Sequence, residues 1–259
     1  MGWIWPCVAL ILSIWVASVW RITSLSSRLP SKPLFLSSRS EKRKNVLLVM
    51  AHPDDESMFF SPTIMNLASE GHQIHLLCIS VGNADGLGST RKQELYHACT
   101  IFEIPREQIQ ILDHQNLQDG FHNKWEHNLL GQFINDSIAI WNIDTVITFD
   151  KYGVSGHPNH RDVHHAVRKF MHESLPREIE AWELISMSIF RKYSGPASVW
   201  PSLLCSSSYQ KRDMLLLLNS NPYQSFHAMA KHKSQWVWFR KLFVVFSSYT
   251  YMNILHKIS

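Results

Sequence analysis

Two short clusters of histidines and acids contain the residue types that could carry out chemistry in this chain. The first, His52-Pro53-Asp54-Asp55-Glu56, supplies one imidazole and three carboxylates within a single turn. The second, His157-Pro158-Asn159-His160, adds two imidazoles far downstream. A catalytic zinc ion takes about three protein ligands of these types and keeps a further position open for water. The two clusters together therefore indicate one metal site.

Simpler roles are available for both clusters. Acids just before a helix are commonly caps and dipole partners without any chemistry, and Glu56 most simply caps the helix or orients a ligand. His160 and His164 stand one helical turn apart and could bind a metal by themselves. That pairing leaves His157 without a task, so we favour His160 as the partner of His52 and Asp55.

The flanking residues predict how the two clusters are brought together. Residues 46–50 form an apolar run typical of a strand buried on both faces, and Pro53 ends it because proline lacks the N–H that a central strand needs. A second strand over 145–149 is followed by a glycine-containing loop and a helix over about 158–171. If the two strands are neighbours, the clusters meet at their carboxyl ends, where open α/β sheets bind ligands.

The rest of the chain alternates between strand and helix patterns. We expect further strands over 74–80 and 109–112, and helices over 57–70, 90–102 and 126–141. Strands separated by helices of this length imply βαβ units and a parallel sheet. The predicted fold is therefore α/β, with a Rossmann-like parallel sheet sandwiched by helices.

The amino-terminal segment is suited to crossing a membrane. Residues 2–20 are uncharged and mostly apolar, at about the length that spans a hydrocarbon core as a helix. A cleavable signal peptide is the alternative, but no basic region precedes the run. Basic residues greatly outnumber acids just after it, so the positive-inside rule puts the remainder in the cytosol. We expect an anchor over 1–21, a basic tether over 22–44 and one cytosolic domain over 45–259.

Composition excludes several other classes of protein. The net charge is only +4 and much of it lies in the tether, which favours a membrane surface over nucleic acid as the partner. The 4 cysteines have no paired spacing, so neither a disulfide framework nor a cysteine zinc finger is expected. The sequon Asn135-Asp136-Ser137 should stay unmodified in the cytosol. The aromatic and basic segment 234–246 predicts either a core helix or one at the bilayer interface.

The two clusters carry a family resemblance. Ala51-His52-Pro53-Asp54-Asp55-Glu56 together with His157-Pro158-Asn159-His160 resembles the LmbE-like, or PIG-L, family of metal-dependent N-deacetylases, and the likeness runs from about residue 45 to the carboxyl end. It implies a Rossmann-like α/β sandwich with zinc on His52, Asp55 and His160. It also implies Asp54 as general base and His157 as the group facing the developing oxyanion, which His157 would stabilise if its imidazole is cationic. Iron(II) could use the same ligand types.

The resemblance also implies a reaction and a place for it. The reaction is hydrolysis of the N-acetyl group of the glycolipid N-acetylglucosaminyl phosphatidylinositol, at the cytosolic face of the endoplasmic reticulum membrane, as an early step of glycolipid-anchor synthesis. Metal coordination would polarise the acetamide carbonyl and activate water, and Asp54 would move the proton. The alternatives are a metal-dependent phosphoesterase, which would hold two metals and need further acids, and a catalytically inactive, membrane-anchored glycolipid-binding scaffold.

Residues outside the clusters are candidates for binding the substrate. Arg91 could bind a sugar hydroxyl or phosphate, and Asp113 and Asp119 could accept hydrogen bonds from a sugar. On helical spacing, however, Arg91 and Glu94 could form a simple exposed ion pair. The two aspartates could equally be ordinary residues of a surface loop.

Overall fold

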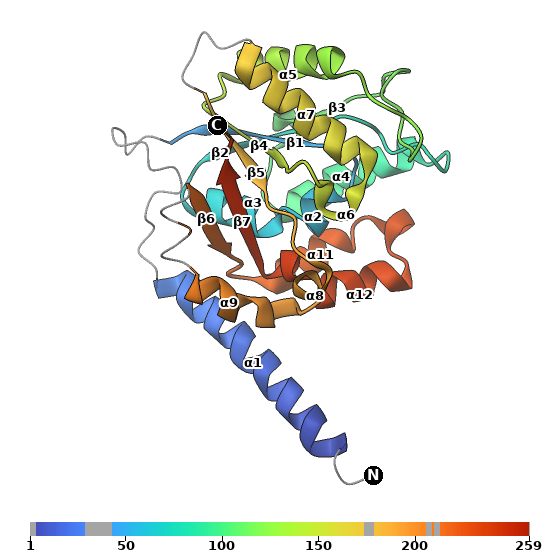
Figure 1. Ribbon diagram of the computed structural model, residues 1–259. Helices are drawn as coiled ribbons and strands as arrows, with labels where there is room; N and C mark the ends of the chain where they lie inside the picture. The colour runs from blue at the N-terminus through green and yellow to red at the C-terminus, as the bar shows by residue number, and fades with distance from the viewer. Residues whose placement is uncertain (1–3, 29–42, 174–178, 206–208, 210–212, 259) are drawn as a thin grey trace.

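The computed structural model describes residues 4–28, 43–173, 179–205, 209 and 213–258, which form a seven-stranded sheet with helices on both faces (Figure 1). The strand order is β3-β2-β1-β4-β5-β7-β6. The strands are β1 (Asn45–Met50), β2 (Gln73–Cys78), β3 (Ile109–Ile111), β4 (Thr145–Phe149), β5 (Glu180–Leu184), β6 (Met214–Leu218) and β7 (Met252–Lys257). The first five strands pair in parallel, and β7 runs antiparallel to both β5 and β6.

The helices of the described residues include the crossover connections between the parallel strands. They are α1 (Ile4–Arg28), α2 (Asp55–Met58), α3 (Ser61–Ser69), α4 (Gly88–Ile101), α5 (His127–Trp141), α6 (Gly153–Gly156), α7 (Pro158–Glu173), α8 (Ile189–Lys192), α9 (Val199–Leu204), α11 (Pro222–Met229) and α12 (Trp238–Phe246). Short 3-10 turns are η1 (Arg106–Gln108), η2 (Gly195–Ser198), η3 (Lys233–Gln235) and η4 (Ser248–Thr250). In Figure 1, α5 and α7 lie side by side on one face, with α3 on the other.

The predicted α/β fold is confirmed, and the strand that leads into the first cluster is its centre. Every residue of β1 after Asn45 is buried, as expected for a parallel strand covered on both faces. The strand β4 pairs directly with β1, with Val46 opposite Thr145 and Leu48 opposite Ile147. The condition for bringing the two clusters together is therefore met.

Two details differ from what the sequence predicts. The single helix expected over 57–70 is two helices, α2 and α3, because the chain turns at Phe59 and Phe60 before Pro62 begins a new helix. The carboxyl-terminal strands β6 and β7 make the sheet mixed rather than purely parallel. The two strands pair with each other although α11 and α12 lie between them in the chain, so their pairing has no signal in the local sequence.

The apolar amino-terminal segment forms α1, which extends away from the domain (Figure 1). Residues Ile4–Ser26 are the one stretch within the described parts of the chain that is long and apolar enough to cross a membrane, by length and composition. The helix continues to Arg28, so residues 22–28 of the predicted tether are helical, while 29–42 lie outside the described residues. This continuation is explained by packing, since Ile22 is fully buried against the domain.

The aromatic and basic segment over 234–246 contains η3 and α12, which pack onto the domain beside the base of α1. Val244 is buried, and the ring of Phe246 makes an edge contact with Trp15 of α1 at a centroid distance of 5.4 Å. Trp238, Phe239 and other apolar side chains of the helix remain exposed. The helix therefore closes the domain on one side and presents an apolar face on the other.

Candidate active site

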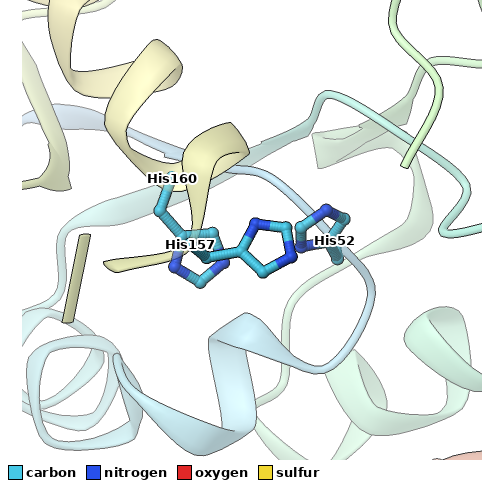
Figure 2. Close-up of side chains that lie close together, drawn as sticks. All are labelled: His52, His157 and His160. Carbon is cyan, nitrogen blue, oxygen red and sulfur yellow. The ribbon is translucent and has the colours of Figure 1, made fainter. Parts of the chain in front are cut away.

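The three histidines of the two clusters converge at the carboxyl ends of β1 and β4. His52 follows β1 directly, whereas His157 and His160 lie at the start of α7. Figure 2 shows the three imidazoles close together, and one nitrogen of each lies within 4.8 Å of the others. Within the described residues, this is the group of potential ligands that could hold a metal ion.

The orientation of His160 is set by its surroundings. Its Nδ1 hydrogen-bonds the carbonyl oxygen of Gly153 at 3.1 Å, and its ring stacks on Phe149 with the centroids 4.1 Å apart. This arrangement leaves Nε2 to face the site, as in a metal-binding histidine whose second nitrogen is held by a carbonyl. Gly153 has φ +60°, and a Cβ there would lie 2.9 Å from Cβ of His160, so a side chain would displace the imidazole.

The carboxylate of Asp55 joins the two clusters. Its Oδ2 accepts hydrogen bonds from the amides of Ala51 and His52 at 3.0 and 2.9 Å, while Oδ1 lies 3.3 Å from Nε2 of His160. Burial alone would raise its pKa, but the neighbouring His160 and His52 lower it well below its usual range. Asp55 is therefore an ionised, immobile acid with one oxygen directed at His160.

The donor set fits a divalent metal ion. Nδ1 of His157 is buried and has no hydrogen-bond partner, which leaves a polar nitrogen for a ligand to satisfy. Burial and the nearby imidazoles of His52 and His160 lower the pKa of His157 to about 4. Imidazole nitrogens gathered beside an ionised carboxylate are the donors that zinc and similar cations bind.

Asp54 occupies a strained position next to this cluster. Its φ is +115°, in the left-handed region that a residue with a side chain enters at an expense of about 1–3 kcal/mol. Oδ2 accepts hydrogen bonds from Arg240 at 2.9 Å and from Arg91 at 3.4 Å. Burial raises the pKa of this carboxyl group, and the two guanidinium groups oppose the rise. Asp54 therefore combines a raised pKa with fixed orientation, as a proton-transferring group requires.

Glu56 holds the turn that carries Asp54. Its Oε2 accepts a hydrogen bond from the amide of Asp54 at 3.0 Å, and Oε1 pairs with Nε2 of His232 at 2.6 Å. Both side chains are fully buried. Burial lowers the pKa of His232, but the charge and hydrogen bond of the Glu56 carboxylate raise it, and the net shift is upward. Of the two roles that the sequence suggests for Glu56, the structure supports positioning.

Arg91 is buried rather than exposed, and it does not pair with Glu94. Its guanidinium donates to the carbonyl oxygens of Pro53 and Gly82 at 2.8 and 2.9 Å and lies 3.4 Å from Asp119. Glu94 instead accepts hydrogen bonds from the amide and hydroxyl of Ser234. The predicted surface ion pair is therefore wrong, and Arg91 braces the loop of the first cluster.

Asp119, not Asp113, reaches the cluster. Oδ1 of Asp119 lies 3.0 Å from Nε2 of His52, which also faces Oδ1 of Asn159 at 3.2 Å. Burial raises the pKa of Asp119, but the hydrogen bond with His52 and its charge outweigh that effect and lower it. Asp113 is exposed on the loop and has no contact with these side chains among the described residues.

His164 stands apart from the three clustered histidines. Its Nδ1 faces the carbonyl oxygen of Phe149 at 3.0 Å and Glu183 at 3.2 Å. Burial lowers its pKa to about 4. Because its hydrogen-bonded nitrogen points back to β4 and β5, the structure does not group it with His160 as a chelating pair.

Two residues of the site were not singled out from the sequence. Arg240 and His232 come from the carboxyl-terminal segment and contact Asp54 and Glu56 across the fold. Spacing could not reveal either residue, because the contacts join segments that are distant in the chain. The one available signal was the aromatic and basic segment 234–246, which contains Arg240.

Comparison with known proteins agrees with this geometry. The family model described as PIG-L, GlcNAc-PI de-N-acetylase, matches residues 47–171, a range that contains both clusters. A probable N-acetylglucosaminyl-phosphatidylinositol de-N-acetylase of Schizosaccharomyces pombe is 38% identical over 226 residues, covering 85% of this chain and 90% of that protein. The chain belongs to the PIG-L family.

Other relatives support the assignment to the PIG-L family. The N-acetylglucosaminyl-phosphatidylinositol de-N-acetylase of Bos taurus is 38% identical over 212 residues, covering 81% of this chain and 82% of that protein. The solved N,N'-diacetylchitobiose deacetylase of Pyrococcus horikoshii has a TM-score of 0.59 at 14% identity, covering 85% of this chain and 80% of that one. At that identity the structural likeness shows the fold alone.

Proposed function

We propose that this protein is a metal-dependent N-deacetylase that hydrolyses N-acetylglucosaminyl phosphatidylinositol to glucosaminyl phosphatidylinositol and acetate, in GPI-anchor biosynthesis. The observation that carries the proposal is the placement of Asp54 beside three convergent imidazoles, in a chain whose relatives of that name match most of its length. A phosphoesterase with two metals would need two sets of ligands, whereas the described residues form one group that could hold a metal ion.

The metal ligands in this proposal are His52, Asp55 and His160. The 3.3 Å separation of Asp55 Oδ1 and His160 Nε2 suits two atoms that share one small cation, and Asp55 is held ionised. His157 then stays on the open side of the site, facing the substrate. Zinc is the metal that these ligand types favour, and iron(II) is the runner-up.

The protein's own residues move the proton and stabilise charge. A divalent metal supplies Lewis acidity, which polarises the acetamide carbonyl and lowers the pKa of water toward neutrality. Asp54 takes the proton of the attacking water and later delivers it to the nitrogen as the carbon–nitrogen bond breaks. Arg240 and Arg91 hold the Asp54 carboxylate in place for both transfers.

His157 is the donor for the developing oxyanion. With a pKa of about 4 it is neutral at pH 7, so it donates through an N–H group. One well-placed donor of this kind lowers the barrier by about 3 kcal/mol. The proposal is therefore a neutral donor in place of the cationic imidazole considered from the sequence.

The membrane arrangement follows from the apolar helix and its basic flank. The anchor is residues 1–21 in a single pass of the endoplasmic reticulum membrane, residues 22–44 lead to the domain, and residues 45–259 form a catalytic domain that faces the cytosol. The excess of basic residues after α1 supports this orientation. In sealed microsomes, added protease should digest the domain without detergent. Full protection, or sugar on Asn135, would reverse the topology.

The decisive experiment is incubation of the purified full-length protein with N-acetylglucosaminyl phosphatidylinositol, with and without a chelator. Free amine and acetate should form in equal amounts, and chelation should stop both until zinc is restored. Release of a phosphorylated product would favour the phosphoesterase. Binding of the glycolipid without any product would favour the inactive scaffold.

A further inference from the structure

A cavity lies beside the catalytic residues, between α12, α8 and α2. Its volume is about 400 Å3. Most of its lining is apolar, and it includes Phe239, Leu242, Phe243 and Phe246 of α12. Two cationic side chains, Lys192 and Arg240, also line it. An apolar cavity with two cations has the chemistry of a site for an amphipathic anion.

Residues at one end of the cavity contact the catalytic centre, and a residue at the other end contacts α1. Arg240, which lines it, donates to Asp54, and the ring of Phe59 lies 5.8 Å from that of His160. At the opposite end, Phe246 contacts Trp15 of α1. A ligand that fills the cavity would therefore extend from the reacting group toward the side of the domain from which α1 emerges.

Lys192 is the unexplained residue of this cavity. It is only 7% exposed, and its Nζ donates a hydrogen bond to the carbonyl oxygen of Val154 at 3.3 Å. No carboxylate lies within ion-pair distance of it in the described residues, and burial lowers its pKa. A buried ammonium group normally has a paired anion, so the missing partner points to an anionic ligand.

We propose that this cavity binds the phosphodiester and glycerolipid part of the substrate, with Lys192 holding the phosphate and the apolar face of α12 holding the lipid. The inference rests on the proposed function, because that function supplies a ligand that carries both a phosphodiester and a sugar acetamide. Arg240 then serves two neighbours, orienting Asp54 and contributing positive potential at the mouth of the cavity.

The outer rim of the cavity matches an entry route from a bilayer. Phe239 and Phe246 of α12 line the cavity and are 54% and 44% exposed, and aromatic rings favour the interfacial region of membranes. Figure 1 places α8, α9 and α12 on the side of the domain to which α1 is attached. A lipid held in the same leaflet can therefore reach the cavity without leaving the membrane surface.

The test compares three acetamide substrates in detergent-solubilised full-length protein. They are the lipid-linked substrate, N-acetylglucosaminyl inositol phosphate without lipid, and N-acetylglucosaminyl inositol without phosphate. Lys192→Met should raise KM about tenfold or more for the two phosphorylated substrates and leave the third within about twofold. Lys192→Arg should restore most of the loss. Leu242→Ser should raise KM for the lipid-linked substrate alone.

Controls separate this inference from the proposed function. Lys169→Met removes a lysine of α7 that pairs with Asn128 and Glu173, and it should change no KM. Calorimetric binding of glycerophosphoinositol, which needs no turnover, should weaken about tenfold in Lys192→Met. Equal loss on all three substrates, or unchanged glycerophosphoinositol binding, would overturn the cavity assignment. Absence of free amine from every substrate with the unmodified protein would instead overturn the deacetylase function.

Discussion

The guanidinium of Arg240 lies 2.9 Å from the carboxylate of Asp54, although 186 positions separate the two residues in the chain. The contact means that the catalytic centre is completed by the carboxyl-terminal segment, outside the range that the family model matches. Arg240 also hydrogen-bonds the side chain of Gln235 in η3. The orientation of the proposed general base therefore depends on the docking of η3 and α12.

Replacing Arg240 should impair the reaction through Asp54. We expect Arg240→Gln to lower kcat/KM about tenfold or more, because a hydrogen bond between charged groups is lost at a buried carboxylate. Steady-state rates with the lipid-free, phosphate-free substrate measure this effect without a contribution from lipid binding. The neighbouring Lys241→Gln, at an exposed position, is the matched control and should stay near the unmodified rate. Equal activity of both variants would separate Arg240 from catalysis.

Replacing the proposed general base should separate chemistry from metal binding. Asp54→Asn keeps the shape of the side chain but cannot take a proton, so kcat should fall by about 10²–10⁴-fold. Metal content, measured by elemental analysis of the purified protein, should stay near that of the unmodified protein. An active Asp54→Asn enzyme would remove Asp54 from the mechanism.

The ligand assignment is tested by metal content. His160→Ala should lose most of the bound metal, because its Nε2 faces Asp55 and the other imidazoles. His164→Ala, one turn further along α7, should keep it, since His164 hydrogen-bonds Phe149 instead. Comparing Asp55→Ala with His157→Ala then identifies the third ligand. If Asp55→Ala kept its full metal content and His157→Ala lost it, His157 and not Asp55 would be the third metal ligand.

The two loop aspartates should differ in their effect on activity. Asp119→Asn removes a carboxylate that contacts both His52 and Arg91, so we expect kcat/KM to fall about tenfold or more. Asp113→Asn alters an exposed side chain and should change kcat/KM by less than about twofold. A larger loss of kcat/KM in Asp113→Asn than in Asp119→Asn would support the substrate-binding role that the sequence suggests for Asp113.

The buried pair of His232 and Glu56 should make stability depend on pH. His232 has a folded-state pKa above its ordinary value of about 6.5, so its contribution is complete below pH 6.5 and declines as pH rises through the raised value. His232→Gln should lower the free energy of unfolding by about 3–5 kcal/mol at pH 6, and by less at pH 9. Denaturant unfolding at both pH values measures the difference.

An exposed histidine provides the comparison for this prediction. His227→Gln on α11 should change the free energy of unfolding little at either pH. If the destabilisation by His232→Gln were the same at pH 6 and pH 9, His232 would be neutral in the folded protein. The pair would then be a hydrogen bond without net charge.

The sequence predicted the parts of the site that depend on local order. The apolar run of β1 before Pro53, and the strand before His157, indicated two loops at one edge of a sheet, and β1 and β4 do pair. The starts of the helices and the glycine-containing loop could also be predicted, because proline fixes the backbone φ angle and glycine permits positive values of it. These features required no knowledge of distant contacts.

The remaining parts depended on which segments meet in space. Nothing in the spacing of Arg91 and Glu94 indicated that the first braces Pro53 and Gly82 while the second binds Ser234. The choice of Asp119 over Asp113 depends on how one loop folds over His52. The contribution of Arg240 required the position of α12, whose amphipathic pattern is equally compatible with a core helix and an interfacial one.

The burial of Ile22 and the contacts of Trp15 have a consequence for how the protein sits on its membrane. The anchor helix is packed against the domain that it carries. The distance of the catalytic residues from the membrane surface is therefore set by the packing of Trp15 and Ile22. Lengthening the connection between residues 28 and 43 should leave that distance unchanged, whereas loosening the seat of Ile22 should let the domain swing away from its lipid-borne substrate.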